Sequence, residues 1–374
     1  MQRLLPLLAL AACGDGTDQP PEPTGPDIQF EVRAQIPAGT EVELCKFVTV
    51  DDAYVTRDEI DFGPGSHHVL VFQTPYTSIP THKDGDPTPI DTSGVFDCSD
   101  GATNGWSVTK VIGGSQNANG GESLLDFPPG VALHISGVLL VNIHYINALD
   151  TALDASVDIG FYSTPAADVV QEGDILFLYN PLIGVPPGGT SRSRWRCPVY
   201  SDITIANVQS HMHARGIGYA ASIGDAAPFY TNDRWEQVPV QRYDDLVVPA
   251  GASLDYYCDY RNTTGASIYQ GPRTTDEMCM LIGSYYPADP RTANCLDESG
   301  TRPGGDWIGN GSATCAQTLQ CMQGAGNNFQ AITDCMLAAS PAVSRPSSDV
   351  LRCFAVAADP ATECAAQIAA CAGS

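Results

Sequence analysis

The sequence predicts a mainly β protein, with two tandem antiparallel β-sandwiches followed by a small disulfide-rich α-helical module. From residue 28 to about residue 287, short apolar runs such as HVLVF, GVLLVNI and SVDIGFY alternate with clusters of Gly, Pro and Asp. Apolar alternation bounded by turn residues is typical of strands in antiparallel sandwiches. A region of this length favours two sandwiches, with the boundary near residues 162–171, where STPAADVV interrupts the pattern.

The last segment differs sharply in composition from the strand-rich region. It is rich in Ala and contains Cys315, Cys321, Cys335, Cys353, Cys364 and Cys371. Asp359 followed by Pro360 is a helix start, because Asp caps a first turn and Pro fits its first position. We expect three disulfides here, in one of fifteen pairings. The predicted domains are residues 28–164 and 165–297 (sandwiches), 298–313 (a Gly-rich linker) and 314–374 (the helical module).

Composition excludes several classes of protein. The chain has 374 residues, 43% of them hydrophobic and 16% charged, which excludes wholesale disorder and a coiled coil. Its net charge is −25 and its 18 basic residues form no cluster, so nucleic acid is not an expected partner. Thirteen cysteines without a Cys-x-x-Cys pair favour disulfides in an oxidising compartment over metal clusters in the cytosol.

The N-terminus has the pattern of a lipoprotein export signal. In residues 1–12, Arg3 precedes an apolar run that ends in Leu-Ala-Ala directly before Cys13. This run is too short to cross a bilayer, and small residues before a cysteine suit lipoprotein signal peptidase. Cys13 is then the acylated first residue, and the Pro- and Gly-rich residues 13–27 form a tether. We expect an exported protein anchored to a bacterial membrane; the alternative is an ordinary secretory signal with a chance cysteine.

Histidines provide the chemical signal. Five of the seven fall in three places, namely the pair His67 and His68, the single His144, and the His-Met-His of His211 and His213. Residues two apart on a strand share a face, so His211 and His213 can bind one metal ion. The adjacent pair needs a backbone bend, which the preceding Gly-Pro-Gly-Ser permits. Imidazoles suit zinc or copper, and an added thioether selects copper(I).

In their order along the chain, these motifs resemble the copper type II, ascorbate-dependent monooxygenases, the family of peptidylglycine α-hydroxylating monooxygenase and dopamine β-monooxygenase. That family has a histidine pair and a hydrophobic-His-Tyr motif in its first sandwich, and His-x-His and Glu-Met-Cys motifs in its second. The matching copper-ligand positions are His67, His68 and His144, and then His211, His213 and Met278. The likeness covers about residues 43–295, and it implies two jelly-roll-like sandwiches with one copper ion each.

The resemblance also implies disulfides and a mechanism. The implied pairs are Cys45–Cys98, Cys258–Cys279 and, as a closing bridge, Cys197–Cys295. By the same resemblance, the copper ion at His211, His213 and Met278 binds dioxygen and abstracts hydrogen from an aliphatic C–H. The ion in the first sandwich then supplies the second electron, and the external reductant is ascorbate or a similar molecule. The catalytic residues are therefore expected in the second set.

The substrate expected from the resemblance is less definite. Where the peptide-amidating branch grips a carboxylate, this chain has Gln209, Met280 and Ile282, none of which provides a charge-assisted hydrogen bond. Asn142 replaces a longer glutamine near the first set. We therefore expect an unidentified small-molecule or peptide substrate other than peptidylglycine, and we assign no catecholamine.

Two other interpretations compete with the monooxygenase. A non-catalytic copper-binding or copper-storage surface lipoprotein would also keep all six ligands. A purely structural or adhesive double sandwich has no reason to keep them. Completeness of the ligand set therefore separates only the last interpretation from the first two.

Overall fold

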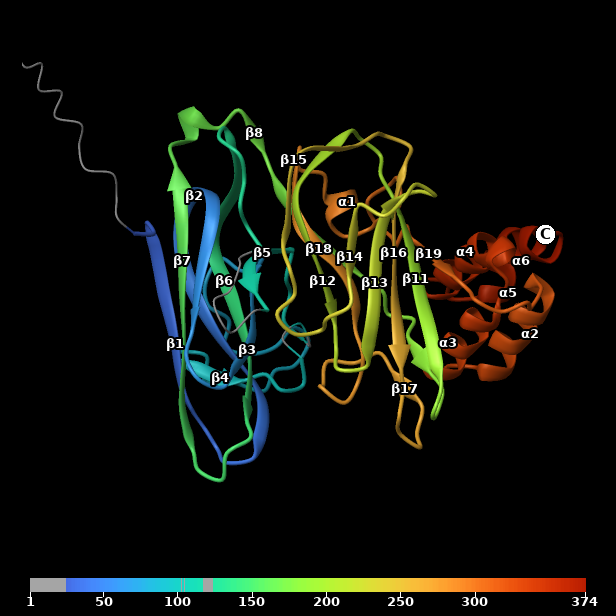
Figure 1. Cartoon of the computed structure of the whole chain (residues 1–374), viewed down its shortest axis with the longest axis horizontal. Helices are drawn as coiled ribbons and strands as arrows, with labels where there is room; N and C mark the ends of the chain where they lie inside the picture. Colours follow the sequence, from blue (N-terminus) through green and yellow to red (C-terminus); the bar gives the residue numbers. More distant parts are fainter. Residues whose placement is uncertain (1–24, 102, 104, 117–123) are drawn as a thin grey trace, which may run out of the picture.

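A computed structural model describes residues 25–101, 103, 105–116 and 124–374. The expected signal peptide, Cys13 and most of the tether lie outside these residues. The predicted fold class is confirmed: antiparallel sheets are the main secondary structure of the described chain, and helices gather at its C-terminal end (Figure 1). No helix among the described residues has both the length and the apolarity that a membrane span requires.

The first sandwich is built from one continuous sheet in the strand order β1-β7-β2-β6-β3-β5, with β4 paired to β2 and β8 to β6. Its strands are β1 (Ile28–Ile36), β2 (Thr40–Phe62), β3 (Ser66–Gln73), β4 (Val95–Asp97), β5 (Lys110–Ser115), β6 (Val131–Asn147), β7 (Leu153–Thr164) and β8 (Gln171–Glu172). The first part of β2 pairs with β6 and its last part with β7, with register shifts between them. This long strand therefore joins the β1–β7 ribbon to the β6–β3–β5 ribbon, and side chains from both fill one core.

The second sandwich contains a four-stranded and a five-stranded sheet, ordered β15-β12-β18-β9 and β14-β13-β16-β11-β19. The four-stranded sheet comprises β9 (Asp174–Tyr179), β12 (Ile203–Met212), β15 (Gln241–Val248) and β18 (Cys279–Tyr286). The five-stranded sheet comprises β11 (Thr190–Pro198), β13 (Gly216–Ile223), β14 (Tyr230–Asn232), β16 (Ser253–Arg261) and β19 (Asp306–Ile308). The short strands β10 (Gly184–Val185) and β17 (Ile268–Tyr269) pair with each other, and α1 (Pro290–Ala293) follows β18.

The inner strands of the four-stranded sheet, β12 and β18, are buried on both faces, whereas the edge strand β15 is largely exposed. Because side chains alternate across a strand, Cys279 and Leu281 of β18 pack into the core of the second sandwich, whereas Met280 and Ile282 pack into that of the first. Ile175 of β9 also belongs to the first core. This sheet lies between the first sandwich and the five-stranded sheet in Figure 1. The two sandwiches therefore share an apolar interface.

The helical module packs against the far side of the second sandwich (Figure 1). Its helices are α2 (Cys315–Ala325), α3 (Phe329–Ala338), α4 (Ser344–Phe354), α5 (Pro360–Glu363) and α6 (Ala365–Ala372). Three disulfides join its six cysteines, as Cys315–Cys371, Cys321–Cys335 and Cys353–Cys364. Single turns of 3₁₀ helix span Ala166–Asp168 and Pro341–Val343.

Part of the segment that the sequence indicates as a linker is a strand. Within residues 298–313, β19 pairs with β11 and sets Trp307 opposite Trp195. Arg352 of α4 forms an ion pair with Asp306 at 3.2 Å, and the Ser348 hydroxyl accepts the backbone N–H of Trp307 at 3.0 Å. A strand of three residues next to glycines shows little apolar alternation. It can therefore be recognised only from its pairing with β11.

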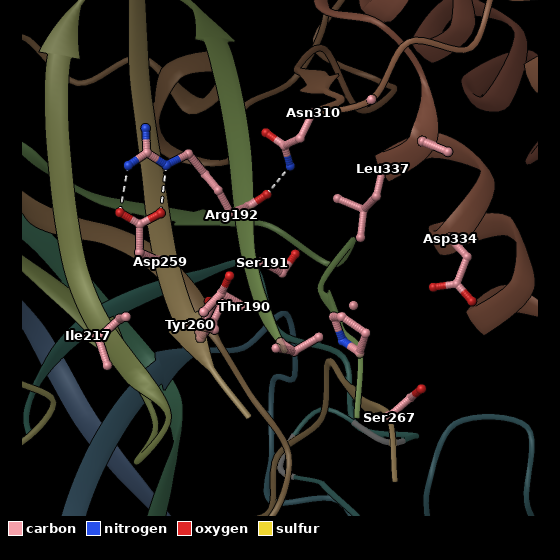
Figure 2. Close-up of a pocket in the computed structure, with 15 residues that line it drawn as sticks. Thr190, Ser191, Arg192, Ile217, Asp259, Tyr260, Ser267, Asn310, Asp334 and Leu337 are labelled. Carbon is pink, nitrogen blue, oxygen red and sulfur yellow. Dashed lines mark hydrogen bonds and ion pairs between the residues drawn. The ribbon is translucent and has the colours of Figure 1, made fainter. Parts of the chain in front are cut away.

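Figure 2 shows an open polar cleft between the module and the second sandwich. In it Arg192 forms a two-pronged ion pair with Asp259, with both N···O distances at 2.6 Å. Asn310 donates to the Arg192 carbonyl, and the Tyr269 hydroxyl donates to Asp334 at 2.9 Å. These polar groups already have partners, and they hold the module in place.

Because the sandwiches share a core, we expect them to unfold together. Ile175→Ala should lower the free energy of unfolding by about 2–5 kcal/mol, since it leaves a cavity between β9 and the first sandwich. Urea unfolding, followed by fluorescence and by far-UV circular dichroism, measures this change. Two separate transitions in the wild-type protein would contradict a shared core.

Candidate metal centre

A β-bulge brings the first three histidines together. The pairing of β3 with β6 shifts register between Ser66 and His68, so that an extra residue, His67, is inserted opposite β6. A bulge re-aims side chains, which allows His67 and His68 both to turn toward His144. His144 is the register partner of His68. One ligand atom from each of the three lies within 4.8 Å of the others. The backbone bend expected from the Gly-Pro-Gly-Ser segment is therefore present.

The second pair lies where β12 ends. His211 and His213 have ring centroids 5.2 Å apart and are both buried. In the register of β12 with β18, Met212 is opposite Cys279, which places the preceding Met278 across from His213. Met278 lines the same cavity as His211 and His68. The structure thus gathers the three expected ligands of the second set at neighbouring strand ends.

The two sets adjoin each other across the interface between the sandwiches. His68 and His211 have ring centroids 6.1 Å apart, and His68 and His144 are 4.9 Å apart. All five imidazoles therefore form one cluster, which we call the histidine cluster: His67, His68, His144, His211 and His213. Its formation depends on the docking of the two sandwiches, which sequence spacing does not reveal.

Protein acceptors fix the tautomers of three of these rings. The Nε2–H of His144 donates to the Glu41 carboxylate at 2.9 Å, while its Nδ1 is buried without a hydrogen-bond partner. The Nδ1–H of His211 donates to the Gln116 amide oxygen at 2.7 Å, and that of His213 to the Asp276 carbonyl at 3.1 Å. Each ring then offers its other nitrogen as a lone pair. An imidazole held in this way is typical of a metal ligand.

The first pair points to the same chemistry. The Nδ1 atoms of His67 and His68 face each other at 3.2 Å. Together with the unpartnered Nδ1 of His144, they give three converging imidazole nitrogens. Zinc and copper are the ions that such nitrogens prefer. The residues present therefore fit a metal ion, on the observation of a buried nitrogen that has no partner in the protein.

Burial keeps the cluster uncharged. Desolvation lowers the pKa of His144 to about 4 and holds the pKa values of His68 and His211 well below the ordinary value, with further lowering from the neighbouring imidazoles. The pKa values of His67 and His213 are also lowered, chiefly by burial. Metal ions bind the neutral ring, so near pH 7 no proton has to be displaced from a ligating nitrogen.

Two side chains connect the cluster across the interface. Glu41 of β2 holds His144 and also accepts the backbone N–H and the hydroxyl of Thr274 at 3.1 and 3.0 Å. Gln116, at the end of β5, holds His211 and donates to Gln209 and to the Ser210 carbonyl, both at 2.7 Å. Although burial opposes ionisation, the bonds from Thr274 lower the pKa of Glu41, so it stays a carboxylate. Each connection therefore orients one ligand and joins the two sandwiches.

Met278 is fixed by its neighbours in the chain. Cys279 forms a disulfide with Cys258 of β16, and the Tyr260 hydroxyl donates to the Met278 carbonyl at 2.8 Å. On its other side, buried Glu277 accepts the backbone N–H groups of His213 and Arg215 at 3.0 and 2.8 Å. Burial raises the pKa of Glu277 to about 7 in spite of these bonds. These contacts therefore hold the loop that follows β12 against Met278, which directly precedes β18.

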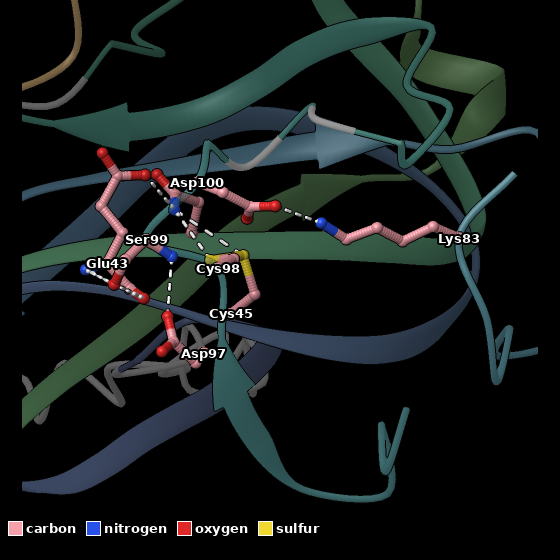
Figure 3. The surroundings of a disulfide bond; sticks show 8 residues. Glu43, Cys45, Lys83, Asp97, Cys98, Ser99 and Asp100 are labelled. Atoms are coloured by element: carbon pink, nitrogen blue, oxygen red, sulfur yellow. Dashed lines mark hydrogen bonds and ion pairs between the residues drawn. A yellow bond between two sulfur atoms is a disulfide. The ribbon is translucent and has the colours of Figure 1, made fainter. Parts of the chain in front are cut away.

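A cavity of about 640 Å³ lies beside the cluster, between the two sandwiches. Most of its wall is apolar, formed by Val69, Leu70, Phe72, Leu124, Phe177, Tyr179, Met278, Met280 and Ile282. At one end lie Glu43, Asn142 and Asp100, next to the disulfide Cys45–Cys98 (Figure 3). Asn142 donates to Glu43 at 3.1 Å, and Asp100 pairs with Lys83 at 2.6 Å. No Lys or Arg is among the described residues that line the cavity.

The structure contains the three disulfides that the resemblance implies in the sandwiches, Cys45–Cys98, Cys197–Cys295 and Cys258–Cys279. Sequence reasoning missed Glu41, Thr274 and Gln116. Glu41 lies two residues before Glu43 and four before Cys45 on one face of β2, and two acidic residues in line with a buried cysteine are the only available signal. Gln116 and Thr274 lie beside Gly- and Thr-rich loops and carry no such signal.

Comparison with known proteins adds no family. No family model matches the chain, and no curated protein does. Among solved structures, the chain is similar to a peptide-N(4)-(N-acetyl-β-D-glucosaminyl) asparagine amidase, with 13% identity over 69% of this chain and 95% of that chain and a TM-score of 0.25. A similarity this weak supports no conclusion about function, so the cluster is interpreted from its own residues.

If Glu41 orients His144, its removal should weaken the first ligand set alone. We expect Glu41→Leu to lower the affinity of that set for Cu⁺ or Zn²⁺ by about 10- to 100-fold, because the ring loses its fixed tautomer. Competition titration with a chromophoric chelator measures the affinity, and the exposed Glu31→Leu is the matched control. Equal affinities in the two variants would exclude an orienting role.

Proposed function

We propose that the protein is an exported copper-dependent monooxygenase that hydroxylates an aliphatic C–H with dioxygen and an external reductant such as ascorbate. One observation carries the proposal: five imidazoles, three of them buried and two half-buried, and a methionine form two adjoining ligand sets beside an apolar cavity. The resemblance to the copper monooxygenases assigns the same six residues. His67, His68 and His144 would hold one copper ion, and His211, His213 and Met278 the other.

The types of ligand favour copper over zinc. A thioether is a soft ligand with little affinity for zinc, and it stabilises copper(I). Copper at these sites supplies one-electron redox chemistry and activation of dioxygen. Monooxygenation consumes two electrons, and the adjoining sets at His68 and His211 provide positions for two one-electron donors. Glu41, Gln116 and the Asp276 carbonyl orient the rings that would hold them.

The cavity selects the substrate. Its apolar wall excludes water from the side of the cluster on which Met278 lies, and it would bind the hydrocarbon part of a substrate. Because Gln209, Met280 and Ile282 supply no positive charge and no basic residue lines the described wall, a carboxylate would lie there unpaired. A neutral substrate, or one without a carboxylate, therefore fits best.

We further propose that Cys13 carries a lipid anchor at a bacterial membrane. Six disulfides place the described part of the chain in an oxidising compartment. The expected result for Cys13→Ser is that the protein moves from the membrane fraction to the soluble fraction of the expressing cells. Continued membrane association of this variant would exclude the anchor.

Metal loading and turnover test the proposed function together. Protein beginning at residue 28 should bind two copper ions per chain, and Met278→Ile should keep the copper ion of the first set and lose oxygen uptake with ascorbate and substrate by at least about 100-fold. Elemental analysis and an oxygen electrode measure these. The matched control is Met336→Ile, which alters a buried methionine of the helical module.

The outcomes separate the competing functions. A wild-type protein with one copper ion or none would overturn the proposal. Two copper ions without ascorbate-dependent hydroxylation across a broad substrate screen would replace it with the non-catalytic copper-binding or storage protein.

A further inference from the structure

A second apolar cavity, of about 660 Å³, lies between the second sandwich and the helical module. We call it the module cleft. Its wall combines side chains of β11 and β19 with those of α2, α3 and α4, among them Trp195, Trp307, Met322, Ile332, Leu351 and Phe354. Phe329 at the start of α3 also lines it and is 49% exposed, which leaves an apolar side chain at the rim. The module thus forms one wall of a site that the sandwich alone lacks.

One polar atom in this wall has no partner. Trp307 is only 9% exposed, and its indole Nε1–H is buried without a hydrogen-bond acceptor in the protein. The neighbouring Trp195 differs, because its Nε1–H donates to Cys295 Sγ at 3.2 Å. A buried donor without a partner is costly, and buried indoles usually find one. This nitrogen is closed off from solvent, so Trp307 presents the face of its ring, and not a free donor, to the module cleft.

The charges of the module cleft exclude an ionic ligand. Among the described residues that line it, the only charged one is Arg352. Its guanidinium is already paired with Asp306 at 3.2 Å and with Asp349, and it donates to the Gly305 carbonyl. An anion would have to displace these carboxylates, and a cation would find no acid in the wall. The chemistry of the cleft therefore suits an uncharged, largely aliphatic molecule.

The module cleft adjoins the cavity beside the histidine cluster. Phe177 and Tyr179 of the edge strand β9 line both cavities. β9 pairs only with β18 among the described strands, so its other edge is free of a neighbouring strand. Both side chains are half-buried. A ligand too long for the first cavity therefore has an apolar path past Phe177 and Tyr179 into the module cleft.

We propose that the substrate is an elongated, uncharged aliphatic molecule bound across both cavities. One end lies beside Met278 and the histidine cluster, and the other lies in the module cleft against the ring of Trp307. This inference rests on the proposed function for the identity of the reacting end. It also gives the disulfide-stapled module a function, which is to complete the substrate-binding site.

Binding to the metal-free protein tests the inference separately from copper chemistry. The probes are methyl decanoate and methyl pentanoate, titrated below their solubility limits and followed by the fluorescence of the tryptophans. Methyl decanoate should saturate the signal, and affinity should fall about fourfold for each methylene removed. Equal affinities for the two esters would overturn the proposal.

Variants locate the two ends of the ligand. Phe329→Asp at the rim should weaken methyl decanoate binding by about tenfold or more, whereas Val356→Asp should leave it unchanged, because Val356 is 56% exposed and outside the lining of the cleft. Trp307→Phe replaces the indole with a smaller ring and should weaken binding by about tenfold through the lost apolar contact. Met280→Trp, which fills the cavity beside the cluster, should also weaken it.

Each result bears on one part of the proposal. Binding that Phe329→Asp and Trp307→Phe leave unaltered would exclude the module cleft. If Met280→Trp were the only one of these three variants to leave binding unaltered, the ligand would be confined to the module cleft. The proposal of an extended substrate would then be overturned. If binding depended on chain length but the protein showed no copper-dependent turnover, the ligand site would stand and the proposed function would be excluded. Copper- and ascorbate-dependent turnover without methyl decanoate binding would leave the proposed function standing and overturn the extended substrate.

Discussion

The site depends on the two inner strands of one sheet, β12 and β18, which are buried from both sides. Alternate side chains of β18 reach the core of the second sandwich, while the intervening ones pack into that of the first. In β12, Val208 reaches the second core, and Gln209 and His211 contact Gln116 of the first sandwich. This double burial holds His211 and Met278 against the strands that carry His68 and His144. Apolar packing is tight and resists small displacements, so the two ligand sets keep one relative position. Without this interface, the two ligand sets would each remain within one sandwich, but they would not adjoin.

Hydrogen bonds then orient the imidazole rings that packing has brought together. Glu41, Gln116 and the Asp276 carbonyl each hold one ring nitrogen of the cluster, which leaves the opposite nitrogen available. Because desolvation also lowers the pKa values of these histidines, the rings are neutral near pH 7. Orientation and protonation state both suit a metal ion, and both follow from burial. The same burial produces the apolar cavity in which a hydrocarbon would react.

The disulfides hold the regions where the sheets provide least support. Cys258–Cys279 fixes the start of β18 next to Met278, and Cys45–Cys98 fixes the polar end of the cavity beside Asn142. In the helical module, three bridges join short helices that could bury little surface by themselves. The module is thereby rigid enough to form the wall of the cleft that contains Trp307.

The sequence by itself determined the mainly β fold class, the helical tail and the candidate ligands, because alternation, turn residues, cysteine content and short histidine motifs are local features. The backbone bend at His67 could also be predicted from the sequence, since Gly-Pro-Gly-Ser precedes it. Only the tertiary structure decided that the two ligand sets adjoin at His68 and His211, that Glu41 and Gln116 hold them, and that β19 and the module complete a second cavity. These features arise from contacts between residues about forty or more positions apart, and local propensity carries no information about such contacts.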